Sequence, residues 1–263
     1  MGEMLHVSSN PHVRDRMTTA KIMQMVFVAL LPAAAVGVWN FGLRALLVLC
    51  VSVLSAVCSE WVYDHFMHKP NTVKDWSAAV TGLLLGMNMP VSIPLCMVVI
   101  VAVVSIVVVK QFFGGIGQNF VNPALAGRIV LLTSFPVAMS TWTQPLTWTM
   151  SKLDGITSAS PLSSIHDMTS GGAAPDVSLV EMLIGWRAGC LGETCAVALL
   201  LGGIYLVVRK VISPTIPLTY IGTVAVIMLI AGKGDFRFVA YELLGGGLML
   251  GAIFMATDYT TSP

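Results

Sequence analysis

The sequence predicts an all-α membrane protein with about eight membrane-spanning helices. Two observations predict this fold class. Hydrophobic residues make up 56% of the 263 residues and charged residues only 10%, whereas soluble domains carry about 25% charged residues. The apolar residues also gather in long runs, and a helix needs about 20 of them to cross a bilayer. The formal net charge of +1 gives no reason to expect nucleic acid as a partner. The apolar runs lead us to expect membrane lipid around the chain.

Eight apolar runs mark the predicted spans. They cover residues 22–38, 43–62, 75–89, 95–109, 123–137, 194–208, 216–231 and 238–257. The third and the fifth are short for a crossing of about 20 residues. One long polar segment, from about residue 140 to residue 178, separates the first five runs from the last three.

A short internal similarity suggests that the spans form two repeats. Residues 82–89 (GLLLGMNM) in the third span resemble residues 247–254 (GLMLGAIF) in the eighth. Helices rich in glycine and leucine also resemble one another by chance, but inverted-repeat membrane proteins carry interrupted helices at corresponding positions of their halves. We therefore expect an inverted-repeat bundle of about ten helices, of which the last two are missing here.

On this interpretation the chain has four parts. They are a cytoplasmic N-terminal segment at 1–21, a first transmembrane repeat at 22–138, an external loop at 139–190 and an incomplete second repeat at 191–263.

Basic residues near the span ends predict the orientation, because such residues gather on the cytoplasmic side of a membrane. With a cytoplasmic N-terminus, the inside segments hold Arg14, Arg16, Lys21, Lys69, Lys74, Lys110, Arg209 and Lys210. The outside segments hold Arg44, Lys152, Arg187, Lys233 and Arg237. The excess on the inside predicts that the long polar loop faces outward.

The polar loop contains the stretch LDGITSASPL at residues 153–162. Its composition is typical of a flexible connector. A long loop kept in an otherwise apolar chain is also typical of a functional segment. Composition leaves both interpretations open.

A second polar stretch, GGIGQNFVNPA at residues 114–124, joins the fourth and fifth spans. Pro123 suits the first turn of a helix, with Asn122 as its N-cap. Asn119 and Asn122 lie three residues apart, so they would share one face of a helical turn. The two amides therefore indicate either a capped helix start or a polar site for a ligand, since unwound backbone at membrane depth lies beside protein or a cavity.

Charged residues near the spans are the remaining candidates for a role in function. Glu60, Asp75, Glu193 and Asp258 lie at or near span ends, where they indicate either an ion path or helix caps. Asp75 suits an N-cap and Glu193 a first helical turn. Arg128 lies within the fifth span, where a charge needs a partner. The five cysteines form no CxxC pair, and no P-loop, HExxH or Ser-His-Asp set is visible, so we expect neither a metal site nor catalytic residues.

Several motifs, in the same order along the chain, resemble those of one family. They are SSNPH at 8–12, DWSAAVTG at 75–82, GQNFVNPA at 117–124, GET at 192–194 and MATDY through SP at 255–263. The chain resembles the D subunit of the Rnf-type ferredoxin:NAD oxidoreductase, a membrane complex that couples electron transfer to translocation of Na+ or H+. It is more distantly similar to the B subunit of the Na+-pumping NADH:quinone reductase. The family has two further helices after the position of Pro263.

The resemblance implies that the external loop carries FMN, bound covalently through a phosphoester. The family pattern covers Thr157 to Leu162 and places the acceptor hydroxyl at Ser160, where the family usually has threonine. Thr157 is the second candidate. A separate flavin transferase attaches the flavin outside the cytoplasm. Asn119 and Asn122 are expected to help to hold a second, non-covalent flavin, for which riboflavin is the candidate.

The leading hypothesis is therefore a subunit of an ion-translocating oxidoreductase, with its N-terminus in the cytoplasm and its spans in the bacterial cytoplasmic membrane. Its expected partners are the other subunits of an Rnf-type complex and the flavin transferase. The alternative is a small-solute channel or transporter built from inverted repeats, with the stretch at 114–124 as its filter.

Overall fold

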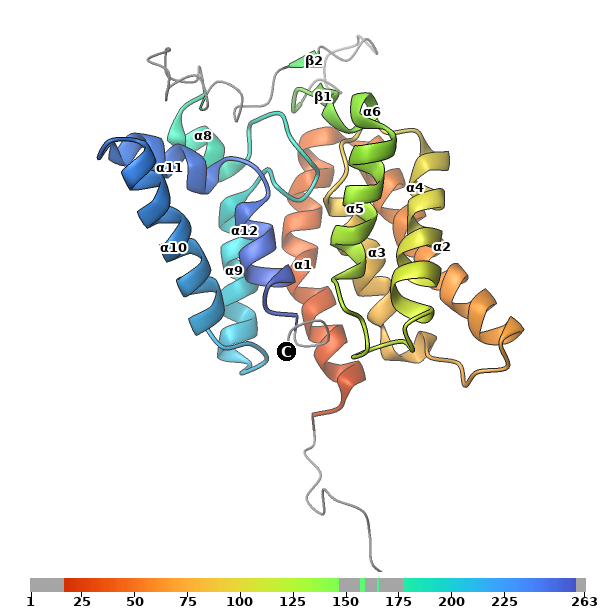
Figure 1. The fold of residues 1–263 in the computed structure, drawn as a ribbon. Coiled ribbons are helices and arrows are strands. Elements are labelled where there is room, and N and C mark those ends of the chain that lie inside the picture. The colour runs from red at the N-terminus through yellow and green to blue at the C-terminus, as the bar shows by residue number, and fades with distance from the viewer. Residues whose placement is uncertain (1–16, 147–156, 159–164, 166–176, 259–263) are drawn as a thin grey trace, which may run out of the picture.

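The computed structural model describes residues 17–146, 157–158, 165 and 177–258. The described chain is mostly helical and has only two very short strands (Figure 1). Every predicted span coincides with helix over most of its length. The all-α class of the prediction is therefore confirmed.

The first half of the chain forms the helices from α1 to α6 in Figure 1. Its elements are α1 (Thr19–Phe41), α2 (Leu43–Phe66), the 3-10 turn η1 (Val73–Asp75), α3 (Ser77–Met87), α4 (Leu95–Val103), the wide π-helical segment η2 (Val104–Gln111), α5 (Pro123–Ser134) and α6 (Pro136–Ser140).

The second half begins in the polar segment. Its elements are β1 (Trp142–Thr143), β2 (Thr157–Ser158), α8 (Leu179–Ile184), α9 (Ala196–Val208), α10 (Thr215–Ala231), α11 (Phe236–Leu244), α12 (Leu248–Leu250) and the π-helical segment η4 (Gly251–Met255). In Figure 1, α1 lies between α9 and the helices of the first half.

Local sequence explains where several helices begin and end. The Thr18 hydroxyl caps α1, and α1 ends where Gly42 adopts φ 73°, a left-handed backbone that glycine tolerates without steric cost. Ser178 and Glu181 form a capping box at the start of α8. Asn122 caps α5 and Pro123 opens it, so the predicted start of the fifth span is confirmed.

Two of the predicted spans are interrupted. The eighth divides into α11 and the pair α12–η4, which are bent by 67° at the three glycines of residues 245–247. The fifth stops at Ser134, and α6 begins anew at Pro136, because a proline inside a helix removes a backbone hydrogen bond. By length and hydropathy, α1 and α2 alone among the described helices suffice to cross a membrane, and the bent pair makes a third if it is one span.

The predicted N-cap at Asp75 and the predicted first-turn position of Glu193 are both wrong. Asp75 belongs to η1, and the residue before α3 is Trp76, which makes no side-chain cap. Glu193 precedes α9 by three residues rather than lying in its first turn. Asp75 lies in a 3-10 turn and Glu193 in a turn closed by its own N–H on Cys190 O, because α3 and α9 start later than their apolar runs indicate.

Glycines bring neighbouring segments into close contact. A Cβ atom at Gly82 of α3 would lie 2.8 Å from Val53 Cα of α2, and the Ser52 hydroxyl donates to Gly82 O at 2.6 Å. A Cβ atom at Gly37 of α1 would lie 2.7 Å from Leu191 O. Small residues allow such approach between apolar helices, which have no hydrophobic drive to associate within lipid.

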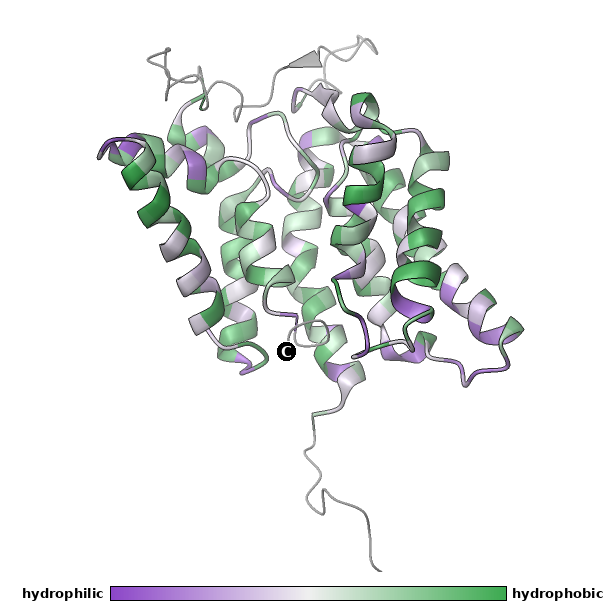
Figure 2. Cartoon of the chain, viewed as in Figure 1, coloured by the Kyte–Doolittle hydropathy of each residue, from purple (hydrophilic) through white to green (hydrophobic). Residues whose placement is uncertain are grey.

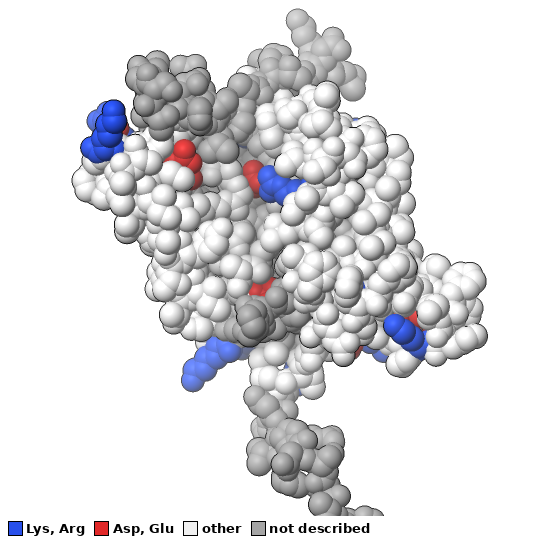
Figure 3. All heavy atoms as spheres, in the orientation of Figure 1, with Lys and Arg blue, Asp and Glu red and all other residues white. Residues whose placement is uncertain are grey.

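The outer surface is suited to lipid. Figure 2 shows that hydrophobic residues predominate along the middle of the helices. Figure 3 shows that few charged side chains interrupt the middle of the face in view. The structure therefore has the apolar exterior of a membrane protein.

The described parts of the polar segment lie at the opposite end of the bundle from the start of α1 (Figure 1). β1 and β2 pair antiparallel, with Thr143 opposite Thr157. Ile165 is fully buried in a small cluster with Met182 and Phe238. The segment is thus joined to the bundle at two places, on either side of residues 159–164.

Candidate functional site

A cavity of about 350 Å³ lies near the end of the bundle at which α1 begins. Its wall comes from both halves of the chain, and its apolar part includes Met23, Val80, Leu84, Leu206 and Phe254. The polar groups along the wall are Ser77, Thr81, Lys110, Asn119, Asn122, Thr257 and Asp258. Binding sites for small molecules have this construction, with a mostly apolar wall and a few polar groups that fix orientation.

Asn122, one of the two predicted asparagines, lines this cavity and is 7% exposed. Its carbonyl oxygen accepts from Ala124 N at 3.0 Å and Leu125 N at 3.4 Å. Its amide nitrogen donates to Asp258 Oδ2 at 3.3 Å. Asn122 is therefore both a helix cap and a wall of the cavity.

Asn119 also lines the cavity and is 8% exposed. With its nitrogen turned toward two backbone carbonyls, the amide donates to Gly115 O and Lys110 O, each at 3.1 Å. The side chain thereby ties the glycine-rich turn to the end of η2. The structure brings the two predicted asparagines to one cavity, although residues 118–122 form irregular backbone rather than the helical turn that the spacing argument assumed.

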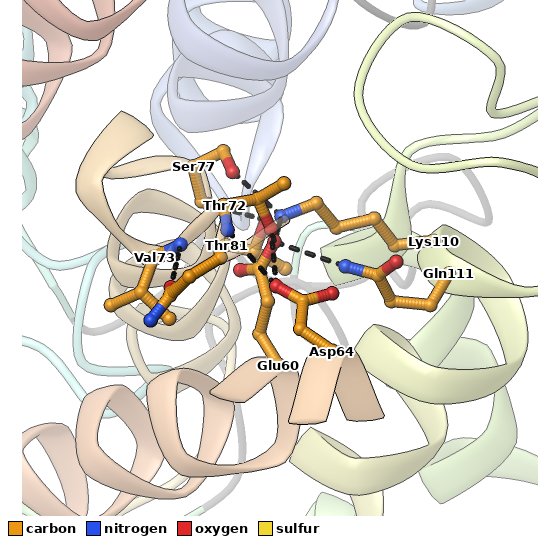
Figure 4. Close-up of polar contacts among 9 residues, drawn as sticks. Glu60, Asp64, Thr72, Val73, Ser77, Thr81, Lys110 and Gln111 are labelled. Carbon is orange, nitrogen blue, oxygen red and sulfur yellow. Dashed lines mark hydrogen bonds and ion pairs between the residues drawn. The ribbon is translucent and has the colours of Figure 1, made fainter. Parts of the chain in front are cut away.

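A buried polar cluster adjoins this wall through Ser77 and Lys110, which also line the cavity. Figure 4 shows the cluster. Lys110 Nζ donates to Glu60 Oε1 at 2.8 Å and to Ser77 Oγ at 2.6 Å. Gln111 Nε2 reaches the same Glu60 oxygen at 3.1 Å. Glu60 and Lys110 are 1% and 2% exposed, and a buried charge of this kind requires a counter-charge.

Asp64 and Thr72 complete the polar cluster. The Thr72 hydroxyl lies 2.7 Å from Glu60 Oε1 and 2.9 Å from Asp64 Oδ2. Glu60 Oε2 and Asp64 Oδ1 have no hydrogen-bond partner within the described part of the chain. Glu60 was a sequence candidate, whereas Asp64, Thr72, Ser77 and Lys110 were missed. The available signals were two acids four residues apart on the second span and a lysine closing the fourth.

Arg128 and Glu193 form a second ion pair, in which Arg128 is 30% exposed and Glu193 is 6% exposed. Arg128 Nη1 lies 2.7 Å from Glu193 Oε1 and 2.7 Å from Asn88 Oδ1. Arg187, which is 4% exposed, donates to the backbone carbonyl of Glu193. The expectation that Arg128 has a partner is confirmed, and the pair joins α5 to the irregular segment before α9.

The two candidate acceptors for a covalent flavin lie away from the cavity. Thr157 is in β2, at the end of the bundle opposite the start of α1. Ser160 lies outside the described residues. The structure thus brings Asn119 and Asn122 together but does not join them to Thr157.

The volume and lining of the cavity are compatible with a mostly apolar ring that has a polar edge. Its volume lies within the roughly 300–1,000 Å³ typical of small-molecule sites. Asn122 and Thr81 can orient a polar edge through hydrogen bonds, and Lys110 supplies the one positive charge among the described residues of the wall. The residues present are therefore compatible with a flavin ring.

Comparison with known proteins matches residues 6–263 to the NQR2, RnfD, RnfE family. The chain is 46% identical over 260 residues to the D subunit of the Na+-translocating ferredoxin:NAD+ oxidoreductase complex of Acetobacterium woodii, covering 98% of this chain and 78% of the relative. It is 40% identical over 267 residues to the proton-translocating counterpart of Clostridium ljungdahlii, covering 98% and 79%.

A third relative is the D subunit of the ion-translocating oxidoreductase complex of Rhodobacter capsulatus. It is 36% identical over 281 residues, which cover 97% of this chain and 78% of the relative. The family match extends over nearly the whole chain, and the identities are high over nearly its full length. The chain therefore belongs to the NQR2, RnfD, RnfE family.

Proposed function

We propose that this chain is the D subunit of an Rnf-type complex, a membrane electron-transfer component of a machine that couples ferredoxin:NAD electron transfer to translocation of Na+ or H+. The observation that carries the proposal is its 46% identity, over 98% of its length, to a protein named as such a subunit. Its partners are the other subunits of that complex. The chain acts within the complex and not as an enzyme by itself.

The proposal includes two flavins at opposite ends of the bundle. A covalent FMN is attached through a phosphoester to Ser160, and Thr157 is the alternative acceptor. The residue before a proline favours extended backbone, so the sequence leads us to expect a Ser160 hydroxyl that a flavin transferase can reach. The flavins supply the redox chemistry, while the chain positions them and sets their surroundings.

The second flavin, with riboflavin as the candidate, occupies the cavity at Asn119 and Asn122. The apolar wall excludes water from the ring, and the amides and hydroxyls orient its polar edge. The support for this assignment is the volume of the cavity and the presence of both asparagines in its wall.

Replacing Asn119 or Asn122 with leucine is expected to remove the non-covalent flavin and to leave the covalent flavin in place, because the two sites lie on different segments. Flavin released by denaturation and flavin retained on the chain are measured separately. Asn122→Ser is the matched variant, since serine also caps helices well. Loss of released flavin in Asn122→Ser as well as in Asn122→Leu supports a ligand contact. Retention in Asn122→Ser would show that Asn122 acts only as the cap of α5.

In the membrane we propose eight crossings, arranged as an inverted-repeat bundle, with the N-terminus in the cytoplasm and the loop at 139–190 outside. The basic residues at the span ends support this orientation. The opposite positions of the start of α1 and of the β1–β2 hairpin in the bundle are compatible with it.

A cysteine at Ser170 is expected to react with a membrane-impermeant thiol reagent in intact cells. The five native cysteines are first replaced by alanine, and a cysteine at Lys69 provides the control for the opposite side. Lys69 lies in the exposed turn after α2. Labelling at Lys69→Cys in intact cells, with Ser170→Cys protected until lysis, would show that the orientation is the opposite of the one proposed.

A denaturing gel distinguishes this function from that of a small-solute transporter. The chain, expressed with a flavin transferase, is expected to give a fluorescent, flavin-positive band. A transporter has no reason to keep a flavin after denaturation. A band without flavin, from cells in which the transferase modifies a known substrate, would argue against the covalent site.

A further inference from the structure

Lys110 is the group in the cavity wall whose bonding is incomplete. An ammonium group has three N–H donors. Within the described residues, Lys110 Nζ uses two of them, on Glu60 Oε1 and Ser77 Oγ. Its side chain is only 2% exposed, so bulk water has little access to the third donor. The side chain also lines the cavity, so a ligand bound there can supply an acceptor for the third N–H.

The charges around the cavity are unequally placed. Lys110 lines the cavity, whereas Glu60 and Asp64 of α2 lie behind it and are not part of its wall. Ser77 and Thr81 of α3 are neutral. On another part of the wall, the Asp258 carboxylate accepts a hydrogen bond from Asn122 at 3.3 Å. An occupant thus meets the Lys110 ammonium at one part of the wall and the Asp258 carboxylate at another, and Glu60 holds the ammonium in position.

We infer that Lys110 is the residue that favours the reduced, negatively charged form of the ligand in this cavity, and that Glu60 is a positioning residue that moderates its charge. The inference rests on the proposed non-covalent flavin. A ring that gains one electron without a proton gains one negative charge. A nearby ammonium stabilises that charge strongly where little water screens it. Charge close to a flavin ring is one of the means by which a protein sets its reduction potential.

The two partners of the ion pair therefore have opposite expected effects. Removing the Glu60 carboxylate leaves the Lys110 charge uncompensated and should raise the reduction potential of the bound flavin. Removing both charges should lower the potential below that of the Glu60 variant and below that of the wild type, because Lys110 is the nearer charge. A purely structural role of the pair would not give shifts of opposite sign.

The measurement is a redox titration of the purified complex with dithionite as the electron donor, followed by flavin absorbance. All chains carry Ser160→Ala, which leaves the non-covalent flavin as the one on this subunit. The variants are Glu60→Gln and the double variant Glu60→Gln/Lys110→Met. The double variant avoids leaving the Glu60 carboxylate without Lys110, because replacing a whole buried ion pair is often neutral for stability. Asp64 is retained in both variants, so its charge does not affect the comparison between them. Lys69→Met is the control, as Lys69 is exposed and lies outside the cavity wall.

We expect Glu60→Gln and the double variant to differ by at least about tenfold in the equilibrium constant for one-electron reduction, which is about 59 mV. The Lys69→Met variant should match the wild type. Equal reduction potentials in Glu60→Gln and the double variant, with flavin bound in both, would overturn the proposed role of Lys110 but not the flavin site. A wild-type chain that binds no non-covalent flavin would overturn the cavity site and this inference with it.

Discussion

Replacing Ser160 with alanine is expected to abolish the covalent flavin of this chain. Alanine has no hydroxyl, so no phosphoester can form at that position. The Ser160→Thr variant should keep the flavin or carry more of it, because threonine restores the hydroxyl that the family pattern usually has. In-gel flavin fluorescence, normalised to the amount of chain, measures both outcomes after expression with a flavin transferase.

The neighbouring hydroxyls provide the control for this prediction. Thr157, Ser158, Ser163 and Ser164 lie within four residues of Ser160, and composition does not choose among them. Alanine at Thr157 should leave the covalent flavin unchanged. Full fluorescence in Ser160→Ala, together with its loss in Thr157→Ala, would show that the flavin is attached to Thr157 in β2.

Replacing Arg128 with methionine is expected to reduce the stability of the fold by up to about 3 kcal/mol, the lower end of the usual cost of removing one partner from a buried ion pair, because Arg128 itself is 30% exposed. Glu193 is only 6% exposed, and Arg128 supplies its counter-charge at 2.7 Å. The same change also removes a hydrogen bond to Asn88. Thermal or denaturant unfolding of the purified protein in detergent, followed by tryptophan fluorescence, measures the loss.

A double variant separates the lost charge pair from a general packing defect. Arg128→Met/Glu193→Gln should recover much of the stability, because no unpaired carboxylate remains. Arg209→Met is the matched arginine control: Arg209 is exposed at the end of α9, and surface changes usually stay within about 0.5 kcal/mol. Equal losses in Arg128→Met and the double variant would show that the ion pair contributes little.

The sequence was sufficient to locate the helices and part of the candidate site. Apolar runs predict spans because burial in lipid depends on local composition. Asn122 and Pro123 predict a helix start because capping acts over a single turn. Arg128 predicts a partner because a charge within an apolar segment is costly. Each of these predictions depends on a few adjacent residues. The structure confirms helices at the apolar runs, the Asn122 cap and the partner of Arg128.

Interactions between distant residues could not be predicted in this way. Glu60 and Lys110 are 50 residues apart, and their contact depends on how α2 and η2 pack rather than on either local sequence. The bend before α12 was missed because the apolar run continues through the glycines of residues 245–247. Hydropathy does not distinguish a straight span from one that is broken by flexible residues.

The central claim, that this chain is the flavin-carrying subunit of an Rnf-type complex, is tested most directly by mass spectrometry of the chain purified from its native membrane. The account predicts a chain heavier by one phosphoester-linked FMN, with the added mass on the peptide that contains Ser160. It also predicts that the other subunits of the complex are recovered with the chain. A chain of unmodified mass, recovered without those subunits, would contradict the account.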